Sequence, residues 1–149
     1  MYKVLFVCHG NICRSPMAEF VMKELVRRAG VSESFVIDSK ACRTDEIGSD
    51  THPGTQRVLR AHDVPFTPRR ARQIRRDDYD AWDYIIGMDA ENMRDLRQLF
   101  PDDPAGKLHL LLAFAGEERD VADPWYTGHF EQTYTDVLRG CQSLLAALQ

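Results

Sequence analysis

The sequence predicts an α/β protein: one domain, residues 1–149, with three α/β/α layers around a central, four-stranded, parallel, twisted sheet. Two observations predict this class. Apolar runs of strand length alternate with segments of helical length, which is the pattern of successive βα units. The chain of 149 residues is long enough for one well-buried core, and it shows no repeat, linker or low-complexity tract. We therefore expect the functional site at the carboxyl edge of the sheet.

The elements follow one another along the chain. Strands are predicted from short apolar runs at residues 4–7, 35–39, 83–88 and 107–111. Helices are predicted at residues 18–29, 54–61, 90–99 and 130–148. The first and last of these show apolar residues three or four positions apart, as an amphipathic helix does. Gly30 closes the first helix, Pro101 stops the third, and residues 64–66 form a turn.

The octapeptide C-H-G-N-I-C-R-S at residues 8–15 is the candidate functional loop. Cys8 follows the first apolar run, and Ser15 and Pro16 suit the N-cap and first turn of a helix. A loop between a strand and a helix N-terminus points backbone N–H groups inward, and the helix dipole adds positive charge there. Phosphate fits such a loop, Arg14 offers a bidentate fork for its oxygens, and Cys8 lies where a nucleophile would face phosphorus.

The same surroundings predict a reactive thiol. A helix N-terminus and an arginine stabilise a thiolate, and Ser15 is placed to donate its hydroxyl to the sulfur. The alternative is that Cys8 is an inert buried cysteine, and the surrounding loop residues favour the catalytic interpretation.

Composition excludes several classes of function. A net charge of −4 argues against a dedicated nucleic-acid binder. The N-terminal apolar run is too short for a signal peptide or a membrane span, so we expect no membrane partner. Two of the four cysteines lie in the candidate loop, which favours a reducing cytoplasm over disulfide bonds. We expect no metal and no cofactor, because no second ligand pair accompanies Cys8, His9 and Cys13.

Three segments carry a resemblance to a known family. V-C-H-G-N-I-C-R-S-P at residues 7–16 resembles the phosphate loop of the low-molecular-weight protein tyrosine phosphatases. Residues 71–74, followed by residues 82–89, resemble the middle section of that family, and D-P-W-Y at residues 123–126 resembles its late D-P loop. The resemblance covers nearly the whole chain, and the combination of an N-terminal C-x5-R-S with a late D-P is highly specific.

The resemblance implies hydrolysis of phosphotyrosine and aryl phosphates through a cysteinyl-phosphate. Cys8 would be the nucleophile, Arg14 would bind phosphate, and Asp123 would be general acid and then general base. For Asp123 the alternative is a surface turn. The further substrate-binding residues that the resemblance implies are His9, Gly10, Asn11, Ile12, Cys13, Ser15, Trp125 and Tyr126. The expected partner is a phosphotyrosine protein, such as a tyrosine kinase, and the enzyme is expected to be a monomer.

Several of these residues have an alternative role. Trp125 and Tyr126 match an aromatic wall of the substrate cleft, and core packing is the alternative. Asn11 and Ser39 match a pair that, with Ser15, supports the loop by hydrogen bonds, whereas Asn11 could serve only a local left-handed turn and Ser39 could cap its own strand. The family also implies that Cys13 forms a protective disulfide with Cys8 on oxidation; otherwise it is a small buried support.

Two segments depart from the family's pattern and leave peptide preference open. Thr44-Asp45-Glu46 stands where many relatives have an aromatic residue, so that side of the cleft is expected to be acidic. Arg69-Arg70 stands where animal relatives have histidine before A-R-Q. The five arginines of residues 69–76 could dock acidic phosphopeptides, but we interpret them as a solvated face paired with Asp77, Asp78 and Asp80.

Three other functions are weighed against a phosphatase. An arsenate reductase needs a further pair of resolving cysteines, and the second half has only Cys141. A cysteine-phosphorylated carrier would lack the acid of the Asp123 loop. A phosphoarginine phosphatase has threonine where this chain has the bulkier Ile12, which favours an aryl phosphate. The remaining cysteines and histidines read as structural, surface or packing residues: Cys42, Cys141, His52, His62, His109 and His129.

Overall fold

Four parallel strands form the centre of the molecule, in the order β2-β1-β3-β4. The computed structural model describes residues 1–149. The strands are β1 (Tyr2–Cys8), β2 (Phe35–Ala41), β3 (Tyr84–Gly87) and β4 (Leu108–Leu110). All three neighbouring pairs are parallel. The predicted fold class, a parallel four-stranded sheet between helices, is confirmed.

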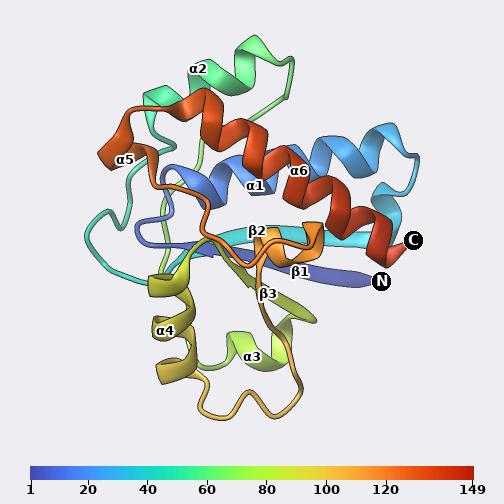
Figure 1. Cartoon of the computed structure of the whole chain (residues 1–149), viewed down its shortest axis with the longest axis vertical. Helices are drawn as coiled ribbons and strands as arrows, with labels where there is room; N and C mark the ends of the chain where they lie inside the picture. The colour runs from blue at the N-terminus through green and yellow to red at the C-terminus, as the bar shows by residue number, and fades with distance from the viewer.

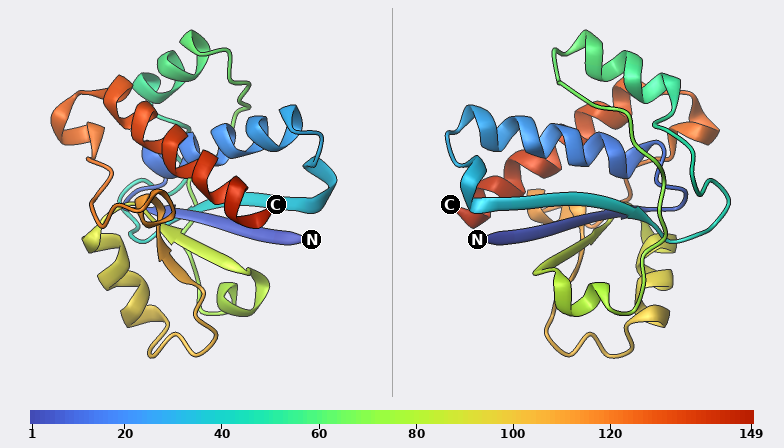
Figure 2. Two further views of the ribbon diagram at one scale, coloured as in Figure 1. Left: turned by 45° about the vertical axis from the view of Figure 1, so that its right-hand side comes forward. Right: turned by 180° about the vertical axis from the view of Figure 1, so that it is seen from behind.

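Helices cover both faces of the sheet, as Figures 1 and 2 show. On one face lie α1 (Arg14–Arg28), α2 (Pro53–Ala61) and α6 (Phe130–Leu148), and on the other lie α3 (Asp78–Ala81) and α4 (Ala90–Leu99). Side chains of β1 alternate between these layers because successive strand residues point to opposite faces. Val4 and Phe6 belong to the larger core with α1 and α6, whereas Leu5 and Val7 pack with α4. A strand buried on both faces explains the continuous apolar run.

The longest helix, α6, packs along α1. Val137, Cys141 and Leu144 are completely buried in this contact layer. Gly140 permits a close approach to a short 3-10 helix, η2 (Leu111–Ala115), because a Cβ on Gly140 would lie 2.5 Å from Leu111 Cγ. Neither α6 nor any other helix combines the length and apolar character needed to cross a lipid bilayer.

One predicted helix start is wrong. Ser15 does not cap α1, because the helix begins at Arg14 and its N-cap, Cys13, makes no side-chain capping bond. The Ser15 hydroxyl is turned to Cys8 and Asn11 instead. Gly30 follows α1 with a φ of 73°, the left-handed conformation expected of a closing glycine. The short elements η1 (Ser32–Ser34), η2, α3 and α5 (Pro124–Thr127) were not predicted.

The sheet has a switch point at its carboxyl edge. β1 and β3 are neighbours, but α1 leaves the end of β1 on one face of the sheet and α4 leaves the end of β3 on the other. Ligands bind in the crevice that such diverging connections open. Cys8 ends β1 at this edge, and both chain termini lie at the opposite end of the sheet (Figure 2).

Candidate active site

The loop between β1 and α1 forms the floor of a cleft of about 130 Å³. Three segments meet there: this loop (residues 8–15), which we call the phosphate loop after the family segment it resembles, the loop after β2, and the segment around α5. The lining residues are Cys8, His9, Gly10, Ile12, Cys13, Arg14, Asp45, Glu46, Asp123, Trp125 and Tyr126. All predicted site residues except Asn11, Ser15 and Ser39 therefore line one cleft, and those three lie buried beneath it.

A directed chain of hydrogen bonds ends on the sulfur of Cys8. Asn11 Nδ2 donates to Ser39 Oγ at 3.0 Å and to Ser15 Oγ at 2.8 Å. Because Ser15 Oγ accepts from Asn11, its own hydrogen is free to point at Cys8 Sγ, 3.1 Å away. The backbone N–H of Ser15 also donates to this sulfur, at 3.4 Å. Two hydrogen-bonding groups of Ser15, its hydroxyl and its backbone N–H, therefore converge on this sulfur.

Arg14 is fixed on one side and free on the other. Its Nη1 donates to Asp89 Oδ2 at 2.7 Å and to the Val121 carbonyl at 2.9 Å. Its Nη2 has only a longer contact, 3.4 Å, with Asp123 Oδ2, and its buried Nε has no hydrogen-bond partner. Burial lowers the pKa of Arg14, but the negative charges of Cys8, Asp89 and Asp123 outweigh it and raise the pKa overall. The charged guanidinium thus presents an edge, formed by the unpaired Nε and the weakly held Nη2, that suits two oxygens of a phosphate.

Asn11 holds the middle of the loop in a left-handed turn, with a φ of 60°. Both its carbonyl oxygen, at 2.8 Å, and its side-chain Oδ1 accept hydrogen bonds from the guanidinium of Arg69. Ser39 Oγ, which accepts from Asn11, donates to the buried Glu19 Oε1 at 2.6 Å. The two roles considered for Asn11, a local turn and a hydrogen-bonding support, therefore coexist.

The interpretation of residues 69–76 as a solvated face is wrong for Arg69, and the predicted partners are wrong for Arg72, which is itself exposed. Arg69 lies beneath the phosphate loop with 11% of its side chain exposed. Arg72 pairs with Asp38 at 2.8 Å rather than with the acidic residues that follow it. Asp78, one of the expected partners, instead accepts a hydrogen bond from Lys40 Nζ at 2.8 Å. The interpretation assumed that these arginines pair with the acidic residues next to them in the sequence. The chain turns back across β2 here, and other residues become their neighbours.

Asp123 lies at the N-terminus of α5 and faces the floor of the cleft. Its Oδ1 accepts from the Trp125 backbone N–H at 3.1 Å, and its Oδ2 points at Arg14. Pro124 occupies the first turn of α5, where a missing N–H costs nothing. The capping bond orients the carboxyl group of Asp123, which lines the same cleft as Cys8, and its side chain remains 21% exposed.

The walls of the cleft differ in character. Trp125 and Tyr126 are 56% and 81% exposed and line one wall, so the alternative of core packing is wrong for both. The part of the rim formed by the loop after β2 is acidic, as expected, because Asp45 and Glu46 line it. His9 Nε2 lies 2.7 Å from Asp45 Oδ2, and His9 Nδ1 lies 3.2 Å from Glu91 Oε1. The hydrogen bond to Asp45 raises the pKa of His9 above its ordinary value, and Glu91 adds to the rise against the effect of burial.

All four cysteines are free. Cys13, within the loop, is buried, and this burial raises the pKa of its thiol, as does the charge of neighbouring Cys8. Cys141 is completely buried between α6 and α1, and Cys42 is half-buried beside α4. No group of three histidine, cysteine, aspartate or glutamate side chains is arranged to hold a metal ion.

Comparison with known proteins assigns this arrangement to a family. The family model described as low molecular weight phosphotyrosine protein phosphatase matches residues 3–149. The chain belongs to this family. It is 41% identical to the low molecular weight protein-tyrosine-phosphatase YfkJ of Bacillus subtilis, covering all of this chain and 97% of YfkJ, and the structure of YfkJ superposes with a TM-score of 0.96.

Other members of the family are similar over the same length. PtpA of Staphylococcus aureus is 37% identical over 97% of this chain and 92% of its own. The structure of a low molecular weight phosphatase from Streptococcus pyogenes is 42% identical, covers 100% of this chain and 94% of its own, and has a TM-score of 0.90. A Drosophila protein named as an arginine phosphatase is 30% identical, with a TM-score of 0.90, and covers 99% of this chain and 98% of its own.

Three polar residues around the family's loop were missed from the sequence. Asp89 accepts a hydrogen bond from Arg14, and Glu19 accepts one from Ser39. Arg69 donates to Asn11. Asp89 could have been found, because it follows a predicted strand at the same sheet edge as Cys8 and precedes a helix. Glu19 and Arg69 gave no comparable local signal.

Proposed function

We propose that this protein tyrosine phosphatase hydrolyses phosphotyrosine and other aryl phosphates through a cysteinyl-phosphate on Cys8. The observation that carries the proposal is the unpaired Nε of buried Arg14, in the same cleft as a sulfur that receives hydrogen bonds from Ser15. A buried guanidinium with no partner on Nε is costly unless an anion completes it. The family supplies the class of that anion, a phosphate monoester of tyrosine.

The first step transfers the phosphoryl group to sulfur. The phosphate oxygens bind Arg14 and the N–H groups of the loop, and the Cys8 thiolate attacks phosphorus in line with the leaving phenol oxygen. The S–P bond forms as the P–O bond breaks. Asp123 donates its proton to the leaving oxygen, a contribution of roughly 10²–10⁴-fold for general-acid catalysis.

The second step regenerates the enzyme. Asp123, now a carboxylate, takes a proton from water as that water attacks phosphorus. The S–P bond breaks, inorganic phosphate forms, and sulfur leaves as a thiolate that Ser15 stabilises through its two hydrogen bonds. No residue outside Cys8, Arg14, Ser15 and Asp123 has to move a proton or a charge.

The walls of the cleft favour an aryl ester. Trp125 and Tyr126 offer aromatic faces to a phenyl ring, whereas phosphoserine has no ring to contact this wall. Ile12 adds an apolar contact at the floor where the phosphoarginine branch has threonine. Phosphoarginine is therefore the competing substrate that the assay must include.

We propose that the activity is redox-sensitive. Peroxide would oxidise the Cys8 thiolate to a sulfenic acid, and the Cys13 thiol would then attack that sulfur, forming an S–S bond and releasing water. Burial raises the pKa of Cys13, so Cys13 remains a thiol, whereas the sulfur of Cys8 receives the hydrogen bonds of Ser15 and is the proposed site of the first oxidation. A dithiol would reduce the bond and restore the enzyme.

We propose that the chain acts as one domain and as a cytoplasmic monomer. Every residue of the mechanism comes from a single chain, and the phosphate loop requires its cysteines in the reduced state. The protein partners would be phosphotyrosine proteins, such as an autophosphorylated tyrosine kinase. Nucleic acid and membrane are not partners in this proposal, and no cofactor or metal is required.

The proposal is tested by two substitutions and three substrates. Cys8→Ser is expected to abolish hydrolysis of aryl phosphate and keep phosphate binding, with a chelator present throughout. Asp123→Asn keeps the shape of the carboxyl but loses the transferable proton, so the rate should fall far more for phosphotyrosine than for an aryl phosphate with an activated leaving group. Appreciable turnover by Cys8→Ser would refute the mechanism, and faster hydrolysis of phosphoarginine than of phosphotyrosine would refute the substrate class.

A further inference from the structure

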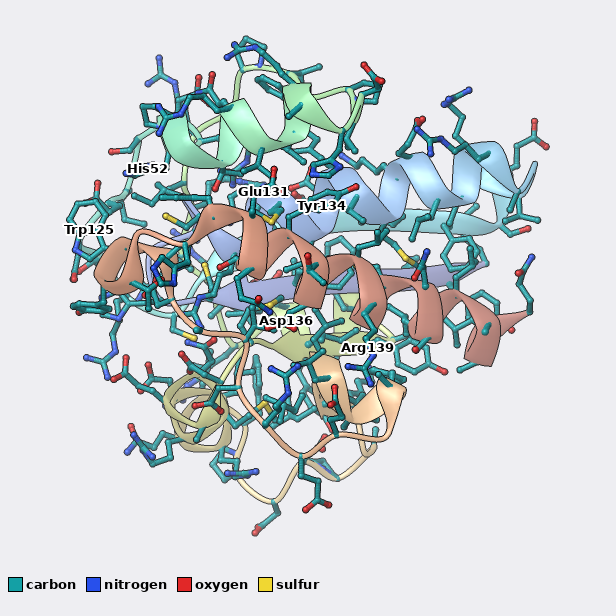
Figure 3. The ribbon with its side chains drawn as sticks, turned by 45° about the horizontal axis from the view of Figure 1, so that its top comes forward. His52, Trp125, Glu131, Tyr134, Asp136 and Arg139 are labelled. Carbon is teal, nitrogen blue, oxygen red and sulfur yellow. The ribbon has the colours of Figure 1, made fainter.

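An aromatic cluster behind the cleft joins its wall to the phosphate loop. The ring of His52 meets Trp125 edge-on, with centroids 5.8 Å apart and an interplanar angle of 84°. On its other side, His52 is stacked on Phe130 at 5.0 Å and 22°. Figure 3 shows His52 and Trp125 at the same end of the molecule, where α5 joins α6. His52 does not line the cleft itself.

Phe130 is fixed in this cluster. A Cβ on Gly54 would lie 2.5 Å from Phe130 Cζ, so the phenyl ring lies directly against the backbone of α2. The same ring packs against the small apolar cluster that two residues of the phosphate loop, Ile12 and Cys13, form with Ala71. Phe130 therefore gives His52 a rigid surface on which to stack.

His52 is fixed independently through its own polar groups. Its backbone N–H donates to the Ile12 carbonyl at 2.8 Å, which ties it to the phosphate loop. Its Nδ1 accepts from the Gly54 N–H at 2.9 Å and caps α2. Backbone, capping bond and stacking together determine the orientation of the ring.

Trp125, by contrast, has little other support. Its side chain is more than half exposed, and His52 is the one aromatic ring it contacts. We propose that His52 is a positioning residue that holds Trp125, and with it the aryl-binding wall, at a fixed place relative to the phosphate loop. The inference rests on the proposed function only in taking Trp125 as that wall.

The proposal distinguishes two contributions to substrate binding, one from the phosphate and one from the aromatic ring. The phosphate of a substrate contacts the loop, whereas its ring contacts the wall. Loss of the His52 ring should therefore weaken binding of an aryl phosphate by about three- to tenfold, the factor that corresponds to one aromatic edge contact. Binding of inorganic phosphate, which does not reach the wall, should not change.

The test uses His52→Asn, because asparagine keeps an acceptor for the Gly54 N–H and removes only the ring. In a Trp82→Phe background, Trp125 is the one remaining tryptophan. We expect a three- to tenfold rise in KM for para-nitrophenyl phosphate, an unchanged inhibition constant for inorganic phosphate, and faster acrylamide quenching of Trp125. His52→Phe, which keeps a ring but loses the cap, should keep the parent KM and quenching while its Tm falls.

His62→Asn is the matched control. The ring of His62 is stacked on Tyr134 at 3.9 Å, between the same two helices, but it lies away from the cleft. It should leave KM, phosphate inhibition and quenching unchanged.

Two outcomes would overturn the proposal. One is a His52→Asn variant with the parent's KM and quenching. The other is a rise in the phosphate inhibition constant that matches the rise in KM, which would show that His52 acts through the loop instead. If the parent failed to hydrolyse aryl phosphates, the proposed function would fall, and the quenching measurement would still decide whether His52 holds Trp125.

Discussion

Replacing Arg69 by alanine is expected to destabilise the protein and slow it, although this residue lies outside the cleft. Arg69 donates to the carbonyl and the side-chain oxygen of Asn11, and its side chain is 11% exposed. Asn11 is completely buried. Alanine would leave the carbonyl without this partner and the side-chain oxygen with only a longer bond, 3.3 Å, from the Arg72 N–H.

The magnitude follows from these two bonds. A hydrogen bond to a charged group contributes roughly 1.5–3 kcal/mol, and a buried acceptor left unpaired costs roughly 1–3 kcal/mol. Allowing for water that enters the space of the lost side chain, we expect a loss of about 3 kcal/mol in the free energy of unfolding. For a chain of this length each kcal/mol shifts Tm by about 2–4 °C, so Tm should fall by about 6–12 °C.

The rate should fall as well, because Asn11 orients the Ser15 hydroxyl toward Cys8. We expect kcat for an aryl phosphate to fall about tenfold or more, as misplacement of a catalytic group by a fraction of an ångström does. Urea unfolding and initial-rate kinetics measure the two effects. Arg70→Ala is the control, because Arg70 is exposed. If Arg69→Ala matched Arg70→Ala in midpoint and kcat, the assigned role of Arg69 would be wrong.

Three further results are expected. Because the pKa of His9 is raised in the folded protein, protonated His9 adds to the free energy of unfolding, by less than about 1 kcal/mol for a side chain this exposed. This contribution is complete below a pH of about 6.5 and disappears as the pH rises through the pKa of His9 in the folded protein. Urea midpoints of the parent and His9→Asn should therefore differ most in acid and converge at alkaline pH, and a constant difference would contradict this. Gly140→Ala should lose about 1–3 kcal/mol to the clash with Leu111, although alanine favours helix by about 1 kcal/mol, and a rise in Tm would contradict the packing. Cys13→Ser should be active but hard to rescue with dithiol after peroxide, and full recovery of this variant would exclude a disulfide to Cys8.

The sequence predicted the parts of the site that are local in the chain. Cys8 and Arg14 are separated by a single loop, and the apolar run before them and the helix after them leave few arrangements for that loop. The strands were found to within about two residues for the same reason, since each is a short run buried on one or both faces. The short helices α3 and α5, four residues each, carry too little periodicity to be recognised.

The support of the loop could not be predicted, because it depends on contacts between distant segments. Arg69 and Asn11 are 58 positions apart, and Glu19 and Ser39 are 20 apart. An arginine run normally indicates a solvated face, and only the return of the chain across β2 places one of its members beneath the loop. For Ser15, by contrast, the sequence made a local prediction that is wrong. Its sequence context favours a helix cap, but the sulfur and the Asn11 amide compete successfully for its hydroxyl.

The contacts of Arg14 also suggest how binding and catalysis are coupled. Asp89 and the Val121 carbonyl hold Nη1, so the guanidinium plane is set without any help from Asp123. The contact between Nη2 and Asp123, at 3.4 Å, is therefore the one that an incoming phosphate can replace at little cost. Once phosphate oxygens bind Nη2 and Nε, Asp123 has lost part of its positive neighbour and gained a negative one. Binding of phosphate therefore frees the Asp123 carboxyl from Arg14 for its role as the acid of the first step. When the phosphoryl group has moved to sulfur and the phenol has left, the same residue is again a carboxylate beside a bound water, as the second step requires.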